Sequence, residues 1–205
     1  MFKPKSPQCF YSEPNILTLL RLVLSIIFFI LAIYKMNPTY NFIGLGIHWL
    51  GDVLDGTYAR TFKQETILGA EIDIIADRVE TLFFYVNFLH FHPHLFTPVA
   101  IYLLDFAFVD FYLSYQFLKY DIISPNYFYK VDKTVYSLNF SPLGKFSNST
   151  VVTLILIFLP KLQILASIFA LGLIGVKIFS IHLLNKKNLA TEKLRIPNKK
   201  EIAFP

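Results

Sequence analysis

The sequence contains little charge and a single cysteine, and both shortages restrict what the chain can be. Only 16% of the 205 residues are charged, while 55% are hydrophobic, and the mean hydropathy is +0.51. A soluble domain of this length rarely carries so much apolar surface, whereas an integral membrane protein does. The lone Cys9 cannot form a disulfide within the chain, which excludes a disulfide-stabilised scaffold.

A cleavable signal, a strand-like pattern and a nucleic-acid-binding patch are also missing. The first apolar run, residues 16–34, is too long for a signal peptide and lacks a small-x-small cleavage site, so we expect it to be a membrane span. No segment alternates apolar and polar residues over the length that a strand needs. The net charge of +5 comes from scattered basic residues that gather only in the tail. We therefore expect no nucleic-acid partner.

Apolar segments predict an all-α integral membrane protein with six transmembrane helices. About 20 mostly apolar residues are needed to cross about 30 Å of hydrocarbon. The segments that reach or approach this length are 15–34, 41–60, 68–90, 95–118, 145–159 and 162–184. The fifth is short, because Pro160 and Lys161 end it, and it could instead form one arm of a re-entrant hairpin.

Basic residues predict how the chain is placed in the membrane. One transmembrane domain, residues 15–184, lies between an N-terminal arm, residues 1–14, and a basic tail, residues 185–205. Lysine and arginine gather in alternate connections: the arm, the turn after residue 60, the loop 119–145 and the tail. Cytoplasmic connections carry such an excess. We therefore expect a multi-pass protein with both termini in the cytoplasm, in a bacterial inner membrane or an endoplasmic-reticulum-type membrane.

Four aspartates lie at helical spacing inside the second and third of these segments. Residues three or four apart share one face of a helix, which places Asp52 and Asp55 on one stripe and Asp73 and Asp77 on another. A short turn joins the two segments, so the helices pack antiparallel and the stripes can face each other. Clustered carboxylates oppose one another's ionisation, so something positive must lie among them. Divalent cations are the best candidates, because hard cations prefer carboxylate oxygens.

A family resemblance follows from the spacing of these residues. The pattern Asp52-x2-Asp55-Gly56-x2-Ala59-Arg60-x8-Gly69-x3-Asp73-x3-Asp77 resembles the signature of the class I CDP-alcohol phosphatidyltransferase family at every fixed position. The stretch PNILTLLRL, residues 14–22, is similar to the family's opening to its first span. The resemblance implies a transferase of phospholipid biosynthesis. Such an enzyme moves the phosphatidyl group from CDP-diacylglycerol to a small alcohol and releases CMP, and residues 15–184 would be its catalytic domain.

The resemblance also implies roles for individual residues. Asp52, Asp55 and Asp73 are expected to bind two magnesium or manganese ions. Asp77 is expected to complete the metal site and to act as the general base toward the acceptor hydroxyl. Contacts to the CDP-lipid are expected from residues beside the aspartates and at the start of the first span: Asn15, Thr18, Gly56, Ala59, Arg60, Thr66 and Gly69. A homodimer within the lipid membrane is a further family-level expectation.

The acceptor alcohol is predicted from residues beyond the signature. The acceptor candidates are Arg78, Asp105, Asp110 and Lys145. The fourth segment carries two aspartates and no arginine, so we expect it to repel a phosphorylated acceptor and to favour a neutral polyol or a cationic amino-alcohol. The stretch DRVET, residues 77–81, is similar to phosphatidylinositol synthases, which favours inositol. Glycerol 3-phosphate is the alternative, since Arg78, Lys133 and Lys145 could gather its phosphate from outside the fourth segment.

Other interpretations stay open at this point. A cation transporter could use the same acids as an ion path, and a non-catalytic relative could act as a lipid scaffold. Arg21 is interpreted as extending to the membrane interface, and His48 as a packing histidine rather than a partner of metal ligands. Lys177 could extend to the interface or reach the rim of the site. The histidines of HFHPHL, residues 90–95, are interpreted as a turn and not as a metal site.

Overall fold

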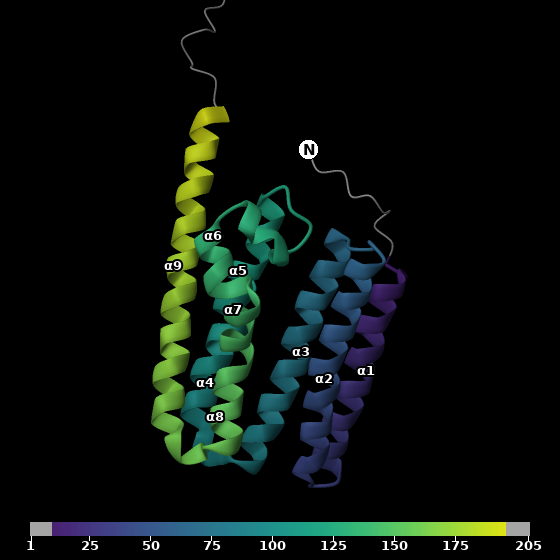
Figure 1. Cartoon of the computed structure of the whole chain (residues 1–205). Coiled ribbons are helices and arrows are strands. Elements are labelled where there is room, and N and C mark those ends of the chain that lie inside the picture. The colour runs from purple at the N-terminus through teal and green to yellow at the C-terminus, as the bar shows by residue number, and fades with distance from the viewer. Residues whose placement is uncertain (1–9, 196–205) are drawn as a thin grey trace, which may run out of the picture.

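The computed structural model describes residues 10–195, with side chains described up to residue 188, and shows helices and turns with no strand in that range. Two groups of helices stand side by side (Figure 1). The first group contains α1 (Glu13–Tyr34), α2 (Pro38–Thr61) and α3 (Ile67–Phe91). The second group contains the elements from residue 93 onward and ends with the long helix α9 (Gln163–Arg195). Most of the expected arm, residues 1–9, and the end of the tail, residues 196–205, lie outside the described residues.

Capping residues explain where the helices of the first group begin. The side chain of Asn37 accepts a hydrogen bond from the backbone N–H of Thr39 at the start of α2. Thr66 accepts one from the backbone N–H of Gly69 at the start of α3. Such caps satisfy N–H groups that have no partner within the helix. The turns between the three helices are short, so neighbouring helices run antiparallel.

Close contacts and buried amides hold the first group together. A Cβ atom at Gly44 of α2 would lie 2.5 Å from the ring of Phe29 in α1, so the glycine lets the two helices approach. The Nδ2 atom of Asn87 in α3 donates to the carbonyl of Phe29 at 2.8 Å and to Oδ1 of Asn41 in α2 at 3.2 Å. These buried hydrogen bonds fix the relative height of all three helices.

The second group is built from short helical pieces. The fourth predicted segment is formed by η1 (Pro93–Leu95), α4 (Phe96–Leu104), the π-helical turn η2 (Asp105–Asp110), α5 (Phe111–Tyr115) and η3 (Gln116–Lys119). The loop that follows contains η4 (Pro125–Lys130), α6 (Lys133–Val135) and the π-helical η5 (Tyr136–Phe140). The fifth segment contains α7 (Pro142–Phe146), the π-helical η6 (Ser147–Val151) and α8 (Val152–Phe158), and η7 (Pro160–Leu162) leads into α9. Turns of the π type widen a helix and are frequent at functional sites.

Helix α3 of the first group packs against the second group along its length, because each of the two apolar cores includes residues from it. One core packs Phe84 and Tyr85 of α3 against Tyr102 of α4 and Leu156 of α8. The other core packs Ile74 of α3 against apolar residues of the second group: Leu113, Phe117, Phe128 and Leu184. Close van der Waals packing of these side chains joins the two groups, because lipid tails are as apolar as the core and add no hydrophobic force between helices.

Three helical stretches of the described chain are long and apolar enough to cross a membrane: Glu13–Tyr34, Pro93–Lys119 and Pro160–Asn188. The helices α2 and α3 have 24 and 25 residues but carry the charged residues of the signature, and the apolar stretch Pro142–Phe158 is shorter. All six predicted segments are therefore helical in the described residues, and an all-helical fold with three candidate membrane-spanning stretches is confirmed. The number of six crossings stays a prediction.

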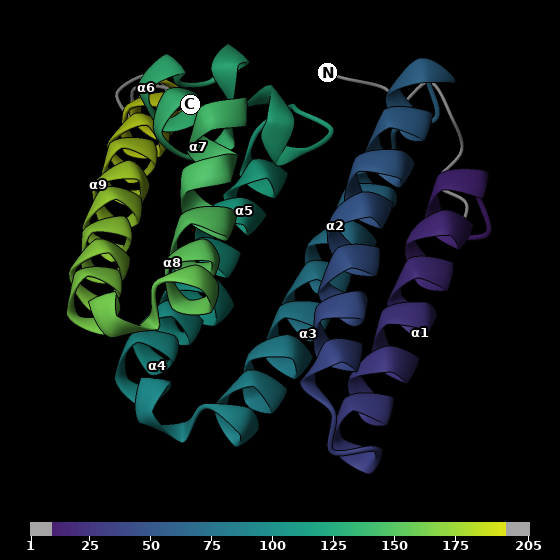
Figure 2. The ribbon, with the colours of Figure 1, turned by 60° about the horizontal axis from the view of Figure 1, so that its bottom comes forward.

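The ends of the described chain lie at one end of the molecule. The start of α1, the turn from α2 to α3 and the end of α9 all point the same way (Figure 1). A second view shows that the two groups approach each other near the α3–α4 connection and diverge toward the other end (Figure 2). Helix α9 continues through residue 195. The first part of the basic tail thus extends the last helix, and the end of the transmembrane domain at residue 184 stays a prediction.

Candidate active site

A cavity of about 710 Å³ lies between the two groups of helices. One wall comes from α1, α2 and α3. The other comes from α4, η2, α5, the loop that leads into η4, η4 itself, η5, α7, η6 and α8. The lining includes the four signature aspartates and all residues expected to contact the CDP-lipid: Asn15, Thr18, Gly56, Ala59, Arg60, Thr66 and Gly69. The tertiary structure thus brings these predicted residues to one place.

Three of the aspartates form a compact group of oxygen ligands. Asp52, Asp55 and Asp73 each offer a carboxylate oxygen within 4.8 Å of the others. The side chains of Asp52 and Asp73 are 45% and 37% exposed, so two of the acids face the open cavity. Asp55 is buried and accepts a hydrogen bond from the hydroxyl of Thr18 at 2.8 Å. Because all the ligand atoms are hard oxygens, the group fits a divalent cation such as magnesium or manganese.

Arg21 of α1 reaches into the middle of the acids. Its nitrogen atoms face five carboxylates at distances between 2.9 and 3.5 Å, namely Asp52, Asp55, Asp73, Asp77 and Glu80. Its side chain is 2% exposed. The expectation that Arg21 extends to the membrane interface is therefore wrong, because a buried guanidinium is more stable beside carboxylates than in hydrocarbon. The sequence carries a weak signal for this, since Arg21 shares a face of α1 with Thr18.

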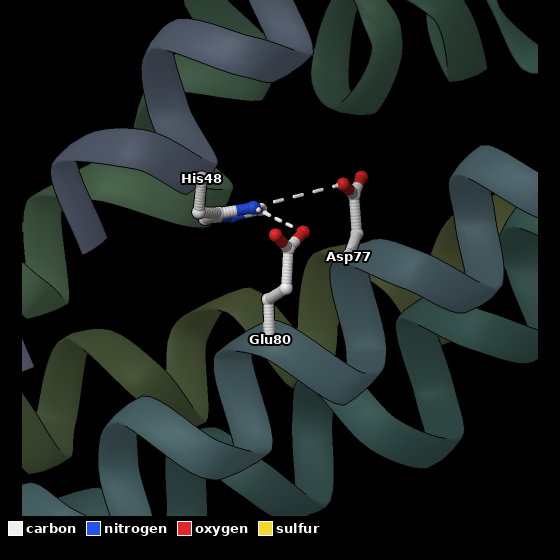
Figure 3. A group of neighbouring side chains, drawn as sticks. All are labelled: His48, Asp77 and Glu80. Carbon is white, nitrogen blue, oxygen red and sulfur yellow. Dashed lines mark hydrogen bonds and ion pairs between the residues drawn. The ribbon is translucent and has the colours of Figure 1, made fainter. Parts of the chain in front are cut away.

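Glu80 is a site residue that the sequence analysis missed. Figure 3 shows His48 of α2 pointing at both Glu80 and Asp77 of α3. The Nδ1 atom of His48 lies 2.8 Å from Glu80 and 4.0 Å from Asp77, and the hydroxyl of Ser25 donates to the other Glu80 oxygen at 2.6 Å. Fully buried Glu80 therefore orients His48 toward Asp77. Its position three residues after Asp77, on the same helix face, was the available signal.

Local packing explains several of the residues expected to contact the CDP-lipid. The hydroxyl of Thr66 caps α3, which fixes this side chain at the cavity edge. A Cβ atom at Gly69 would lie 2.8 Å from Oδ1 of Asn15, so the glycine makes room for the Asn15 side chain. A Cβ atom at Gly56 would lie 3.1 Å from Nη1 of Arg60, one turn further along α2. Small residues therefore let these polar side chains lie close to α2 and α3.

The acceptor candidates occupy two different environments. Arg78, Asp110 and Lys145 line the cavity. Asp105 is absent from the described lining and is fully buried. Arg78 lies 4.5 Å from the ring centre of Phe106 and is also bonded to Asp110, so its guanidinium is held in one place at the cavity wall.

Lys177 of α9 neutralises the two aspartates of η2. Its amino group is bonded to Asp105 and lies 3.2 Å from Asp110, and its side chain is fully buried. The wide π-helical turn η2 lets these aspartates, five residues apart, reach the same amino group. Lys177 therefore does not extend to the interface. Together with Arg78 it leaves no uncompensated aspartate in η2, so the predicted repulsion of a phosphorylated acceptor is not supported.

A tyrosine in the loop after η3 bridges the two groups of helices beside the cavity. Tyr127 of η4 donates a hydrogen bond to Glu65, in the turn between α2 and α3, at 2.5 Å. Both residues line the cavity. Burial and the bond to Glu65 raise the pKa of Tyr127 to about 12, so the hydroxyl stays protonated at neutral pH. This contact thus joins the two cavity walls under physiological conditions.

Sequence comparisons identify relatives of this chain among known proteins. Two relatives are each named a CDP-diacylglycerol–glycerol-3-phosphate 3-phosphatidyltransferase. The protein from Aquifex aeolicus is 34% identical over 93 residues, which cover 44% of this chain and 51% of the relative. The protein from Cereibacter sphaeroides is 34% identical over 106 residues, which cover 49% of this chain and 48% of the relative. The chain thus spans about half the length of each relative. No solved structure matches it significantly.

A model of one protein family matches residues 11–184, which include every helix that lines the cavity. That family is described as CDP-alcohol phosphatidyltransferase, in agreement with the resemblance of the signature. Its members are transferases, and dependence on a divalent metal is general among them. The chain belongs to the CDP-alcohol phosphatidyltransferase family.

Proposed function

We propose that the protein transfers the phosphatidyl group of CDP-diacylglycerol to glycerol 3-phosphate and releases CMP. The observation that carries this proposal is the cavity, whose lining includes the acids and Arg78 on one wall and Lys145 of α7 on the other. The printed names of both relatives give glycerol 3-phosphate as acceptor. They favour this acceptor over inositol, toward which the sequence analysis leaned.

The acid wall supports a metal-dependent reaction. Five carboxylates surround one guanidinium, and this excess of negative charge favours further cations. In our proposal Asp52, Asp55, Asp73 and Asp77 hold two magnesium or manganese ions. When bound, these ions neutralise the diphosphate of the donor and so make CMP a better leaving group.

Asp77 is the proposed general base. It lies beside the metal-binding group, its side chain is 23% exposed in the cavity, and Arg21 donates a hydrogen bond to it at 2.9 Å. The acceptor hydroxyl loses its proton to Asp77 as its oxygen forms a bond to the phosphorus atom of the phosphatidyl group. The bond between that phosphorus and the oxygen that joins it to CMP breaks, and CMP leaves with the electron pair.

The donor is proposed to lie along α1 and α2. Arg60 would pair with a phosphate of the CDP group, and Gly56 would let the nucleotide approach the backbone closely. Further contacts would come from the lining residues Asn15, Thr18, Ala59, Thr66 and Gly69. The acyl chains would stay in the bilayer beside the exposed apolar side chains of the first group.

The acceptor phosphate is proposed to bind between Arg78 and Lys145. Arg78 and Lys177 balance the charges of Asp105 and Asp110, so the net positive charge offered to an anion comes from Lys145. Lys145 is exposed and therefore free to reach a small ligand. Asp105 acts in this proposal only through Lys177, because it lies behind the described lining.

We also propose that all six helical segments cross the membrane, with both termini in the cytoplasm. The charged side chains of α2 and α3 include the four aspartates, which line the cavity. At 1.5 Å per residue, the 24 residues of α2 span about 36 Å, which suffices for a bilayer. Labelling of single introduced cysteines at the two ends of α2 tests the crossing. A homodimer is part of the proposal, and crosslinking in native membranes tests it.

A panel of acceptors tests the proposed reaction. Purified protein is incubated with CDP-diacylglycerol, a divalent cation and either glycerol 3-phosphate, inositol, inositol phosphate or no acceptor, and the lipids are identified by mass spectrometry. We expect phosphatidylglycerophosphate and CMP with glycerol 3-phosphate, and neither after the metal is chelated. Formation of phosphatidylinositol instead would reverse the choice of acceptor. Cation flux through liposomes without any lipid product would favour the transporter interpretation.

A further inference from the structure

Arg21 is a buried cation in a position that a metal ion would also favour. Its guanidinium comes from α1, whereas the acids around it come from α2 and α3. A charged side chain with 2% exposure needs compensating charge, and five carboxylates surround this single guanidinium. Divalent cations that enter this cluster must therefore share its carboxylates with Arg21.

The contacts of the guanidinium are uneven. Its Nη2 atom donates to Asp77 at 2.9 Å and to Asp73 at 3.4 Å. Its Nη1 atom lies 3.5 Å from both Asp52 and Asp55. Within the described part of the chain, neither Nη1 nor Nε donates a hydrogen bond. Buried N–H groups normally have acceptors. The side of the guanidinium that faces Asp52 and Asp55 is therefore held by charge alone.

The weakly held side faces two of the three acids that form the oxygen group, Asp52 and Asp55. Asp52, Asp55 and Asp73 each lie 3.4 or 3.5 Å from Arg21 and also within 4.8 Å of one another. A divalent cation at this group would bind the same carboxylates that now attract the guanidinium. The two cations would repel each other at this distance.

Packing prevents Arg21 from leaving the cluster freely. Gly51 of α2 faces its aliphatic stem, and a Cβ atom there would lie 2.3 Å from Cδ and 2.4 Å from Cγ. The stem is thus enclosed between α1 and α2, and Asp77 and Glu80 hold the far end of the guanidinium at 2.9 and 3.2 Å. A divalent cation therefore binds beside a positive charge that the fold keeps in place.

We propose that Arg21 is a positioning residue that holds the acid cluster together before divalent cations bind and weakens their binding by competing for the same carboxylates. This inference rests on the metal site of the proposed function, but not on the acceptor or on turnover. Loss of the guanidinium has two opposite consequences. The acids repel one another more strongly when metal is absent, and they attract a divalent cation more strongly when it is present. A residue with only a packing role would change stability equally in both conditions.

Manganese binding and thermal unfolding of the purified full-length protein test the proposal. Wild type is compared with Arg21→Met, which keeps the apolar stem, in EDTA and in manganese. We expect Arg21→Met to unfold at a lower temperature in EDTA and to show a larger rise in unfolding temperature with manganese than wild type. The dissociation constant of Arg21→Met for manganese should be roughly tenfold lower than that of wild type. It is measured from the electron paramagnetic resonance signal of the free ion.

Two further variants complete the experiment. Lys35→Met removes an exposed positive charge from the end of the same helix and should bind manganese as wild type does. Arg21→Lys keeps the charge but presents it from one atom, so its affinity for manganese should lie between those of wild type and Arg21→Met. If Arg21→Met does not fold, wild type and Arg21→Lys decide the question. Affinity equal to or weaker than that of wild type in the Arg21 variants would overturn the proposal. No substrate is present, so failure of the lipid assay would leave this result intact.

Discussion

Gly51 and Arg21 lie so close that a Cβ atom at position 51 would be 2.3 Å from the Cδ atom of the arginine. The glycine stands outside the fixed positions of the family signature, one residue before Asp52. It gives the arginine stem a path across α2 and so places the guanidinium among the acids. A residue with no side chain is therefore part of the site.

Gly51→Ala is expected to lower the rate of phosphatidyl transfer by roughly tenfold or more, because it pushes Arg21 and the neighbouring acids out of position. The matched control is Gly46→Ala in the same helix, where a Cβ atom would meet nothing within 4 Å. That control should keep its activity and be slightly more stable, since alanine favours a helix by about 1 kcal/mol over glycine. Equal activity of the two variants would contradict the importance of the Gly51–Arg21 contact.

Asp77→Asn is expected to reduce turnover by about two to four orders of magnitude, because an amide cannot take the proton of the acceptor. Binding of the CDP-lipid should be affected far less. Release of CMP is measured for turnover, and retention of labelled donor for binding. Glu71→Gln serves as control, since Glu71 lies on the same helix but not in the described cavity lining. Unchanged turnover in Asp77→Asn would remove Asp77 as the base.

Lys145→Met is expected to raise the KM for glycerol 3-phosphate by roughly tenfold, because it removes a charge that would attract the phosphate of the acceptor. The KM for CDP-diacylglycerol should change little. Lys119→Met removes an equally exposed lysine that is not among the described lining residues. A similar effect of both substitutions would point to a general effect of charge at the membrane surface instead of a binding site.

Lys177→Met is expected to destabilise the protein by about 3–5 kcal/mol, because it leaves the buried carboxylate of Asp105 without its partner. The double variant Lys177→Met/Asp105→Asn should recover part of this loss, since it removes the unpaired charge as well. Thermal unfolding in detergent measures the stability of the single and the double variant. A double variant that is less stable than Lys177→Met alone would show that the pair is not the source of the effect.

Asp132 should contribute stability that depends on pH. Its carboxylate caps α6 by accepting from the N–H groups of Thr134 and Val135, and it pairs with Lys187 at 2.6 Å. Burial disfavours its charge, but the hydrogen bonds from Lys187 and Val135 outweigh this and lower the pKa of Asp132 below its ordinary value. A lowered pKa stabilises the fold above the ordinary pKa and loses this effect as pH falls through the lowered value.

Asp132→Ala should therefore destabilise the protein by about 1 kcal/mol at neutral pH through loss of the cap. The difference from wild type should shrink as the pH falls below about 4. Thermal unfolding between pH 3 and 8, with buffers of constant ionic strength, measures it. A difference that stays constant over this range would show that the charge of Asp132 does not contribute.

Local features of the sequence predicted most of the helices and the acid stripes. The spacing of Asp73 and Asp77 acts over a few residues, so it is visible without a structure. The number of crossings is less evident from hydropathy, because the site itself places charged residues in α2 and α3. The aspartates that identify the site therefore also make α2 and α3 less apolar than an ordinary membrane span.

The sequence by itself determined the helical, membrane-embedded class of this protein, its family and the four aspartates, because these depend on composition and on spacing along single helices. Only the tertiary structure decided that Arg21 and Glu80 join the acids and that Lys177 neutralises η2. These contacts link residues far apart in the chain, and each depends on which way a helix is turned against its neighbour. A helix rotated by half a turn would have the same local sequence but would point the guanidinium of Arg21 into lipid.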